Sequence, residues 1–309
     1  MKLATTTMDF FSYTHSQTES LRHIRAAGFR YADYSFCCDH SSHSGIYGAN
    51  FEEHIAAVRA TVDEIGIRLV QAHAPMGKPL DDPDGKFLAD TLLAVEACGR
   101  WGIPCLVVHS GYLPGLSPEE TLQRNKEFFL PLLRAAEPYG TCILVENFNK
   151  MYKPDTYWID NAPDLLRMIE LVDHPLFHAV WDTGHANMQA MPQDEALRLL
   201  GSHVRALHVQ DNMGDRDTHL LPFFGTMSMD ALLHGLSDID YVLAMEEICR
   251  KWSIPCYNNY YNCGLSFQNP AQLPWLDEGL VLGIGENRHF SDEAYDFLLT
   301  KYEALLMAL

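Results

Sequence analysis

The chain has 309 residues, of which 47% are hydrophobic and 20% are charged, so it can bury a large core. Asp and Glu together number 41 against 22 Lys and Arg, and the formal net charge is −19. A field of this sign repels phosphate backbones and anionic bilayers, which argues against nucleic acid and membranes as partners. No run approaches the roughly 20 apolar residues that span a bilayer, and no signal segment is evident after Met1. The eight cysteines are scattered without a CxxC pair, which indicates reduced thiols and a cytoplasmic location.

Apolar strand patterns alternate with amphipathic helix patterns, and no low-complexity linker divides the chain. Such alternation requires right-handed crossovers and a parallel sheet. Seven strand–helix units and a terminal helix predict an α/β protein, a single (β/α)8 TIM barrel that forms one domain over 1–309. Strands are expected at 3–10, 31–36, 67–72, 105–108, 142–145, 177–181 and 204–209. Helices are expected at 17–27, 51–65, 90–101, 119–139, 165–172, 193–200, 229–236 and 292–309.

The eighth strand has the weakest pattern. Segments 241–247 and 254–260 both fit it, although 240–252 also has helical spacing. The stretch 253–287 is rich in Tyr, Asn, Pro and Gly, and we expect it to be an irregular insertion in the barrel.

Residues that commonly bind metals stand at the ends of five successive predicted strands. They are His73, His109, Glu146, Asp182 and His208. The C-terminal ends of barrel strands meet at one mouth, where the active sites of such enzymes lie. Burying several carboxylates and imidazoles together is costly unless a cation compensates them. The sequence therefore predicts a divalent metal site, and the mixture of nitrogen and oxygen ligands suits Mn, Co, Zn, Mg or Fe(II).

Each of these residues also has a structural interpretation when it is taken singly. Asp182 suits a helix cap, Glu146 suits a solvated loop, and a lone histidine after a strand is commonly structural. Because five such residues meet at one mouth of the barrel, a metal site is favoured over separate structural roles.

The strand ends resemble those of the xylose-isomerase-like TIM-barrel superfamily, which holds sugar isomerases and epimerases and the family-2 AP endonucleases. The resemblance covers about residues 1–245. Its most specific segments are Asp182-Thr183-Gly184-His185, His208-Val209-Gln210-Asp211 and His219-Leu220-Leu221-Pro222.

The resemblance implies a ligand set for one divalent ion. Glu146, Asp182 and His208 match three of the four ligands of the epimerase branch. The fourth is a glutamate that ends strand eight, for which Glu247 is the candidate, with Glu246 beside it.

By the same resemblance the protein is an isomerase or epimerase of a small sugar or related polyol ketone, in carbohydrate metabolism. The reaction proceeds through an enediolate, with Glu146 and Glu247 as the acid and base. Dimers or tetramers are common among such enzymes, so a homo-oligomer is compatible with the resemblance. The residues implied in substrate binding are His73, His109, His185, Asp217 and His219.

Two alternatives remain open. The endonuclease branch holds three zinc ions, and His73, His109, His185, Asp217 and His219 have counterparts among its further ligands. This alternative is a multi-metal hydrolase of a phosphodiester, although a nucleic-acid-binding face would be expected to be basic. The other alternative is a sugar-binding protein without turnover.

Overall fold

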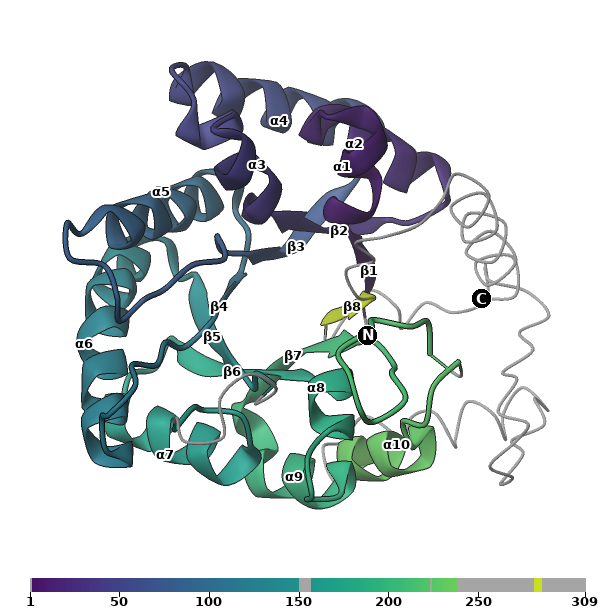
Figure 1. The fold of residues 1–309 in the computed structure, drawn as a ribbon. Coiled ribbons are helices and arrows are strands. Elements are labelled where there is room, and N and C mark those ends of the chain that lie inside the picture. Colours follow the sequence, from purple (N-terminus) through teal and green to yellow (C-terminus); the bar gives the residue numbers. More distant parts are fainter. Residues whose placement is uncertain (1, 150–156, 223, 238–280, 285–309) are drawn as a thin grey trace, which may run out of the picture.

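Eight parallel strands close into a barrel in the computed structural model, which describes residues 2–149, 157–222, 224–237 and 281–284. The strands pair in chain order, and the last pairs with the first (Figure 1). The predicted α/β barrel is confirmed. The strands are β1 (Lys2–Thr6), β2 (Tyr31–Ser35), β3 (Arg68–His73), β4 (Cys105–Val108), β5 (Cys142–Glu146), β6 (Phe177–Asp182), β7 (Val204–Val209) and β8 (Val281–Ile284).

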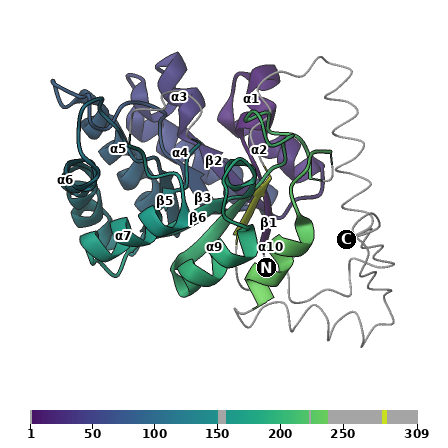
Figure 2. The same ribbon diagram turned by 60° about the horizontal axis from the view of Figure 1, so that its bottom comes forward.

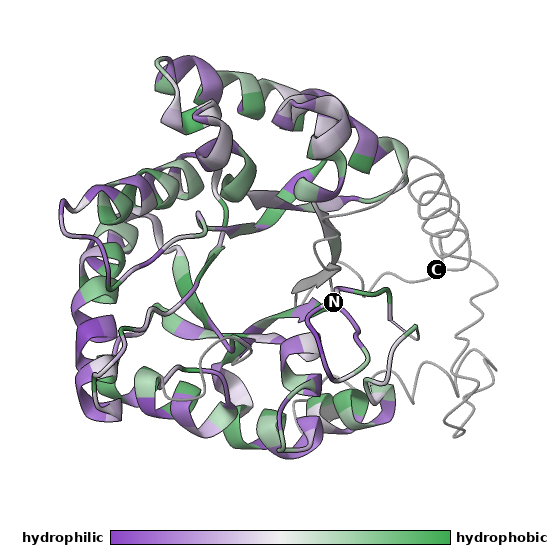
Figure 3. Ribbon diagram, in the orientation of Figure 1, coloured by the Kyte–Doolittle hydropathy of each residue, from purple (hydrophilic) through white to green (hydrophobic). Residues whose placement is uncertain are grey.

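Helices form a ring outside the strands, as Figures 1 and 2 show from two directions. Hydrophilic and hydrophobic residues alternate along them, as expected for helices with one face on the barrel and one in water (Figure 3). None of the helices in the described ranges is long and apolar enough to cross a membrane. The helices are α1 (Met8–Thr14), α2 (Gln17–Ala26), α3 (Phe36–Ser42), α4 (Phe51–Ile65), α5 (Lys86–Trp101), α6 (Pro118–Ala136), α7 (Ala162–Val172), α8 (Thr183–Asn187), α9 (Gln193–Leu200) and α10 (Met229–Ser237).

The prediction for strand eight is wrong. The strand that pairs with both β7 and β1 is Val281–Ile284, inside the stretch 253–287 that was expected to be an irregular insertion. The expected strand segments 241–247 and 254–260 and the helix 292–309 lie outside the described residues. Closure of the barrel depends on how β8 pairs in register with two strands that are distant in the sequence. The sequence pattern of a short segment that contains a glycine does not reveal such pairing.

The start of the chain also differs from the prediction. The first strand ends at Thr6 rather than at residue 10, because α1 begins at Met8. The short helices α3 and α8 follow β2 and β6 directly and were not predicted. Asp182 caps α8 by accepting a hydrogen bond from the backbone N–H of His185, at 2.7 Å. Short helices of this kind carry too few residues for a periodic signal.

The core has two layers. The larger one lies between the strands and the helices and includes Phe36, Phe129 and Trp181, each at most 2% exposed. The smaller layer fills the barrel itself, as in other closed barrels of eight strands. Its buried members are Ala4, Tyr31, Val70, Cys105, Val107, Leu144, Val180 and Ala206. This packed interior leaves the polar residues at the strand ends as the floor of the mouth.

Candidate metal centre at the barrel mouth

The C-terminal ends of β3 to β7 carry the residues predicted to bind a metal. His73, Glu146 and Asp182 are the last residues of β3, β5 and β6. His109 directly follows β4, and His208 is the next-to-last residue of β7. Because all five strands run parallel, these side chains meet at one end of the barrel, as the sequence predicted.

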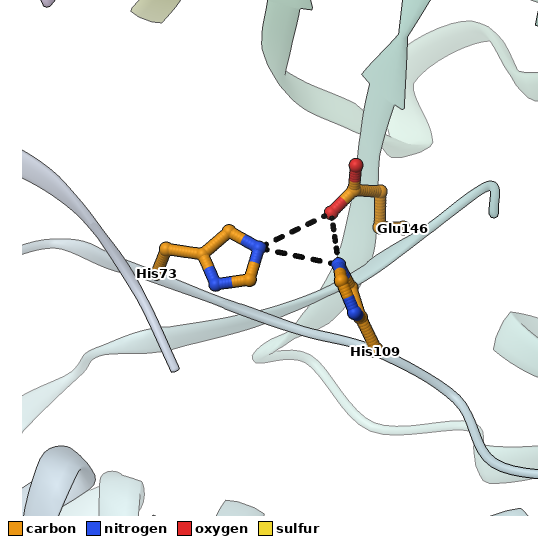
Figure 4. Close-up of side chains that lie close together, drawn as sticks. All are labelled: His73, His109 and Glu146. Atoms are coloured by element: carbon orange, nitrogen blue, oxygen red, sulfur yellow. Dashed lines mark hydrogen bonds and ion pairs between the residues drawn. The ribbon is translucent and has the colours of Figure 1, made fainter. Parts of the chain in front are cut away.

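The first group of side chains that could hold a cation consists of His73, His109 and Glu146 (Figure 4). The Nε2 atoms of the two histidines lie 3.2 Å apart. Glu146 Oε2 lies 2.9 Å from His109 Nε2 and 3.5 Å from His73 Nε2. Three potential ligand atoms thus converge on one point.

The second group shares Glu146 with the first. It consists of Glu146, Asp182 and His208, and one ligand atom from each lies within 4.8 Å of the others. Glu146 uses its other oxygen here, since Oε1 is 3.2 Å from His208 Nδ1. Glu146 and Asp182 are each only 2% exposed, so both carboxylates need a compensating positive charge.

The third group lies beside the second and consists of His185, Asp217 and His219. His185 belongs to α8, and the other two belong to the loop that joins β7 to α10. The two oxygens of Asp217 lie 3.2 Å from His185 Nε2 and 3.1 Å from His219 Nε2. The residues that the sequence implied in substrate binding therefore fall into the first and third groups.

In His73 and His185, a hydrogen bond to a backbone carbonyl determines which ring nitrogen carries the proton. His73 Nδ1 lies 2.7 Å from the carbonyl oxygen of Ala74, and His185 Nδ1 lies 2.8 Å from that of Asn147. A carbonyl oxygen only accepts, so each Nδ1 carries the proton and each Nε2 has a lone pair in the neutral ring. This arrangement is the usual one for histidines that bind metals through Nε2.

The protonation of the carboxyl groups and histidines in the site is governed by burial and by neighbouring charges. Burial would raise the pKa of Glu146, but His208 and His109 outweigh it and hold that pKa well below its usual range. Burial raises the pKa of Asp182. For His185, burial lowers the pKa, but Asp182 and the other carboxylates raise it well above its ordinary value. A divalent cation can replace such protons, so the donors present fit a bound metal.

A glutamine joins the second and third groups. Gln210 Nε2 donates to Asp182 Oδ1 at 3.1 Å and to Asp217 Oδ1 at 3.0 Å. Gly184 makes room for it, because a Cβ at that position would overlap the amide of Gln210. Gln210 is 1% exposed, and its other amide atom, Oε1, is buried without a hydrogen-bond partner.

A second amide supports His208 from inside the barrel. Gln71 Nε2 contacts Asp33 Oδ2 and lies 2.9 Å from His208 Nε2. Partners of this kind orient the first ligands of a metal. The sequence prediction missed Asp33 and Gln71, although each is a buried polar residue between two apolar or aromatic neighbours in its strand. It also assigned no role to Gln210, which stands in one of the family segments.

The loop of the third group is tied to a buried carboxylate. Asp211 accepts hydrogen bonds from the backbone N–H groups of Asn212, Gly225 and Met227, at 2.8, 2.9 and 2.9 Å. Its backbone also pairs with Leu220 in an antiparallel bridge. The loop that carries Asp217 and His219 is thereby closed at its base.

Every described residue predicted for the site lies at this mouth. Glu247 and its neighbour Glu246 were also predicted for the site, and they lie outside the described residues. The roles assigned to the residues, as ligands of a metal or of a substrate, stay predictions.

Comparison with known proteins places the chain in a family. A family model described as a xylose isomerase-like TIM barrel matches residues 21–259, so the chain belongs to the xylose isomerase-like TIM barrel family. The chain is 30% identical over 133 residues to fructoselysine 3-epimerase of Escherichia coli O157:H7, which is 43% of this chain and 46% of that protein. It spans about half the length of the curated relatives that it matches.

Solved structures share the fold over nearly the whole chain. A D-tagatose 3-epimerase-like protein has a TM-score of 0.68 at 20% identity, with 99% of this chain and 98% of that chain covered. The IOLI protein, solved with a bound zinc atom, has a TM-score of 0.69 at 13% identity and covers the same shares. At these identities the likeness shows the fold.

Proposed function

We propose that the protein is a metal-dependent epimerase or isomerase that acts on a small sugar or a related polyol ketone. The observation that carries this proposal is the position of Glu146, a buried carboxylate that belongs to two groups of side chains that could hold a metal ion. The partial similarity to fructoselysine 3-epimerase supports the same class of reaction. The ligands proposed for one divalent ion remain Glu146, Asp182 and His208.

The chain's own residues would provide the proton transfers. A bound divalent cation supplies Lewis-acid stabilisation of negative charge on a carbonyl oxygen. Glu146 is held ionised by its histidine neighbours, so it is suited to take a proton from the carbon beside that carbonyl. His185 directs Nε2 toward the mouth and is suited to orient a hydroxyl of the substrate.

Inversion at carbon needs a second acid or base on the other face of the substrate. Glu247 was assigned this role because it was expected to end strand eight. Since β8 is Val281–Ile284, the first carboxylate after that strand in the sequence is Glu286, two positions beyond Ile284. We therefore propose Glu286 as the fourth ligand and second acid or base, in place of Glu247.

An aromatic side chain next to the first and third groups suits a sugar substrate. The ring of Phe148 lies 4.6 Å from that of His109 and 5.1 Å from that of His185, measured between centroids. Its other neighbour is Trp158, stacked at 4.9 Å. A partly exposed ring at the edge of a polar site can pack against the C–H face of a sugar.

The test is a comparison of Glu146→Gln with the wild type on a panel of ketohexoses and on fructoselysine, with metal content measured by elemental analysis. We expect turnover to fall by about a hundredfold or more, because an amide cannot take the proton. Glu195→Gln, an exposed carboxylate on α9, is the matched control and should leave turnover unchanged. Unchanged metal content and turnover in Glu146→Gln would contradict the proposal.

A comparison of two variants tests whether Glu286 or Glu247 is the fourth ligand. Glu286→Gln should lower both metal content and turnover, whereas Glu247→Gln should change neither. The reverse result would restore the first assignment.

A second function is favoured by one specific observation. The three groups of ligands are each suited to a separate ion, which is the arrangement of a multi-metal hydrolase acting on a phosphodiester. The net charge of −19 argues against a nucleic-acid substrate. Two or three ions per chain, together with hydrolysis of bis(4-nitrophenyl) phosphate, would support this function over epimerisation. Sugar binding without metal or turnover would support a binding protein instead.

A further inference from the structure

Two cysteines face each other at the end of the barrel opposite the mouth. Cys105 is the first residue of β4, and Cys142 is the first residue of β5. The two residues are direct partners in the register of these neighbouring strands. Cys105 belongs to the packed interior of the barrel, and Cys142 packs against the same cluster.

We propose that Cys105 and Cys142 form a peroxide-reactive thiol pair that closes into a disulfide between β4 and β5. Cys142 is the residue that peroxide oxidises first, and Cys105 is the one that then attacks it to form the disulfide. This site is independent of the function proposed for the mouth.

The register of the strands suits the bond. Neighbouring strands lie about 4.8 Å apart, and a disulfide joins Cα atoms separated by about 4.4–6.8 Å. Partners in register point to the same face of a parallel sheet, and both cysteines here contact the interior cluster. The two sulfurs can therefore meet without displacement of either strand.

Exposure and charge separate the roles of the two thiols. Cys142 is partly exposed, whereas Cys105 is buried. A hydrogen bond from the Cys105 thiol, with the positive charge of Arg205, lowers the pKa of Cys142 to about 7. The same contact and burial raise the pKa of Cys105 well above its ordinary value. The thiolate therefore forms at the more exposed of the two residues, and thiolates are the reactive form.

The chemistry balances with hydrogen peroxide as the oxidant. The Cys142 thiolate attacks one peroxide oxygen, so an S–O bond forms, the O–O bond breaks, and the departing hydroxide takes up a proton as water. The sulfur is oxidised to a sulfenic acid and the peroxide is reduced. Cys105 then loses its proton and attacks that sulfur, so the S–S bond forms, the S–O bond breaks, and a second water leaves.

The experiment treats the full-length protein with hydrogen peroxide at pH 7, followed by blocking of thiols, trypsin digestion and mass spectrometry. The expected product is a cross-link between peptides 101–124 and 135–150, which hold Cys105 and Cys142. Peptide 87–100 holds Cys98, which is fully buried and serves as an internal control that should stay reduced. Peptide mapping also reports, separately, the oxidation state of the three cysteines outside the described residues, which are Cys249, Cys256 and Cys263.

Two variants assign the order of events. With dimedone as a sulfenic-acid trap, Cys105→Ser should accumulate an adduct at Cys142, because the resolving thiol is missing. Cys142→Ser should leave Cys105 unmodified. In the untreated wild type, iodoacetamide at pH 7 should alkylate Cys142 about tenfold or more faster than Cys105, following its thiolate fraction.

The proposal fails if peroxide leaves peptides 101–124 and 135–150 unlinked in the wild type. It also fails if Cys105 joins Cys98 instead, or if Cys142→Ser is trapped by dimedone at Cys105.

Discussion

The side chain of Gln210 packs directly against Gly184 at the mouth, so position 184 has no room for a side chain. The amide of Gln210 fills the volume where a Cβ at position 184 would lie. That amide contacts both Asp182 and Asp217, so a single side chain holds the second and third groups at a fixed separation. A change at either position therefore acts on two carboxylates at once.

Gly184→Ala tests this arrangement. The added methyl displaces the Gln210 amide and breaks its bonds to both carboxylates, so we expect a loss of about 1–3 kcal/mol in the free energy of unfolding. Urea denaturation measures it. The control is Gly48→Ala, where a Cβ meets only ordinary contacts and the effect should stay within about 0.5 kcal/mol. Equal losses in the two variants would contradict the shared-space explanation.

The loop between β7 and α10 depends on one carboxylate for its shape. Asp211 is fully buried and receives three backbone N–H groups, including those of Gly225 and Met227 near the far end of the loop. Position 225 also requires glycine, since a Cβ there would overlap the backbone of Asn212. These contacts fix the shape of the loop at the mouth, so that Asp217 lies beside His185 and His219.

Asp211→Ala should release this loop. The substitution leaves three backbone N–H groups without their acceptor, two of them buried, and we expect a loss of about 3 kcal/mol or more in stability. Trypsin should also cut after Arg216 faster than in the wild type, because the loop would open locally. Asp215→Ala removes an exposed carboxylate from the same loop and serves as the control. A trypsin rate equal to that of the control would rule out this role for Asp211.

The predictability of each element follows its length and pattern. The ends of β3, β5 and β6 could be predicted because a buried apolar run stops at a polar ligand residue. The helix α8 could not, since its five residues carry no periodicity. The strand β8 has four residues with Gly283 among them, and its position is decided by register with β1 and β7. Gln71 and Gln210 act through tertiary contacts that no local pattern encodes.

The molecule also carries a buried acid that belongs to none of the three groups at the mouth. Asp39 on α3 is 1% exposed, and it accepts a hydrogen bond from the Tyr34 hydroxyl at 2.7 Å. Burial raises the pKa of Asp39 from 3.8 to about 6, and the hydrogen bonds of Tyr34 and Gln17 oppose that rise only in part. In the folded protein this carboxyl is therefore protonated in a range where the unfolded chain has already ionised it.

The stability of the protein should consequently depend on pH in a defined window. Because the folded pKa of Asp39 is raised, its contribution is fully present below about pH 4 and is lost as pH rises through about 6. The separation of about two pKa units corresponds to about 3 kcal/mol. In Asp39→Asn the decline between pH 4 and 6 should be smaller by about this amount, measured by urea denaturation at several pH values. Asp63→Asn, on the exposed face of α4, should retain the wild-type slope, and an unchanged slope in Asp39→Asn would contradict the assignment.

Glu146 couples binding at the first group of ligands to binding at the second. Its Oε2 belongs to the group with His73 and His109, and its Oε1 belongs to the group with His208. Any ion or proton that settles at one oxygen withdraws charge from the other, so occupancy of the first group changes the affinity of the second. Thermodynamic reciprocity requires the second to change the first by the same factor. Binding of one metal ion at the second group should therefore change the number of protons bound at the first, and Glu146 sets the size and the sign of that change.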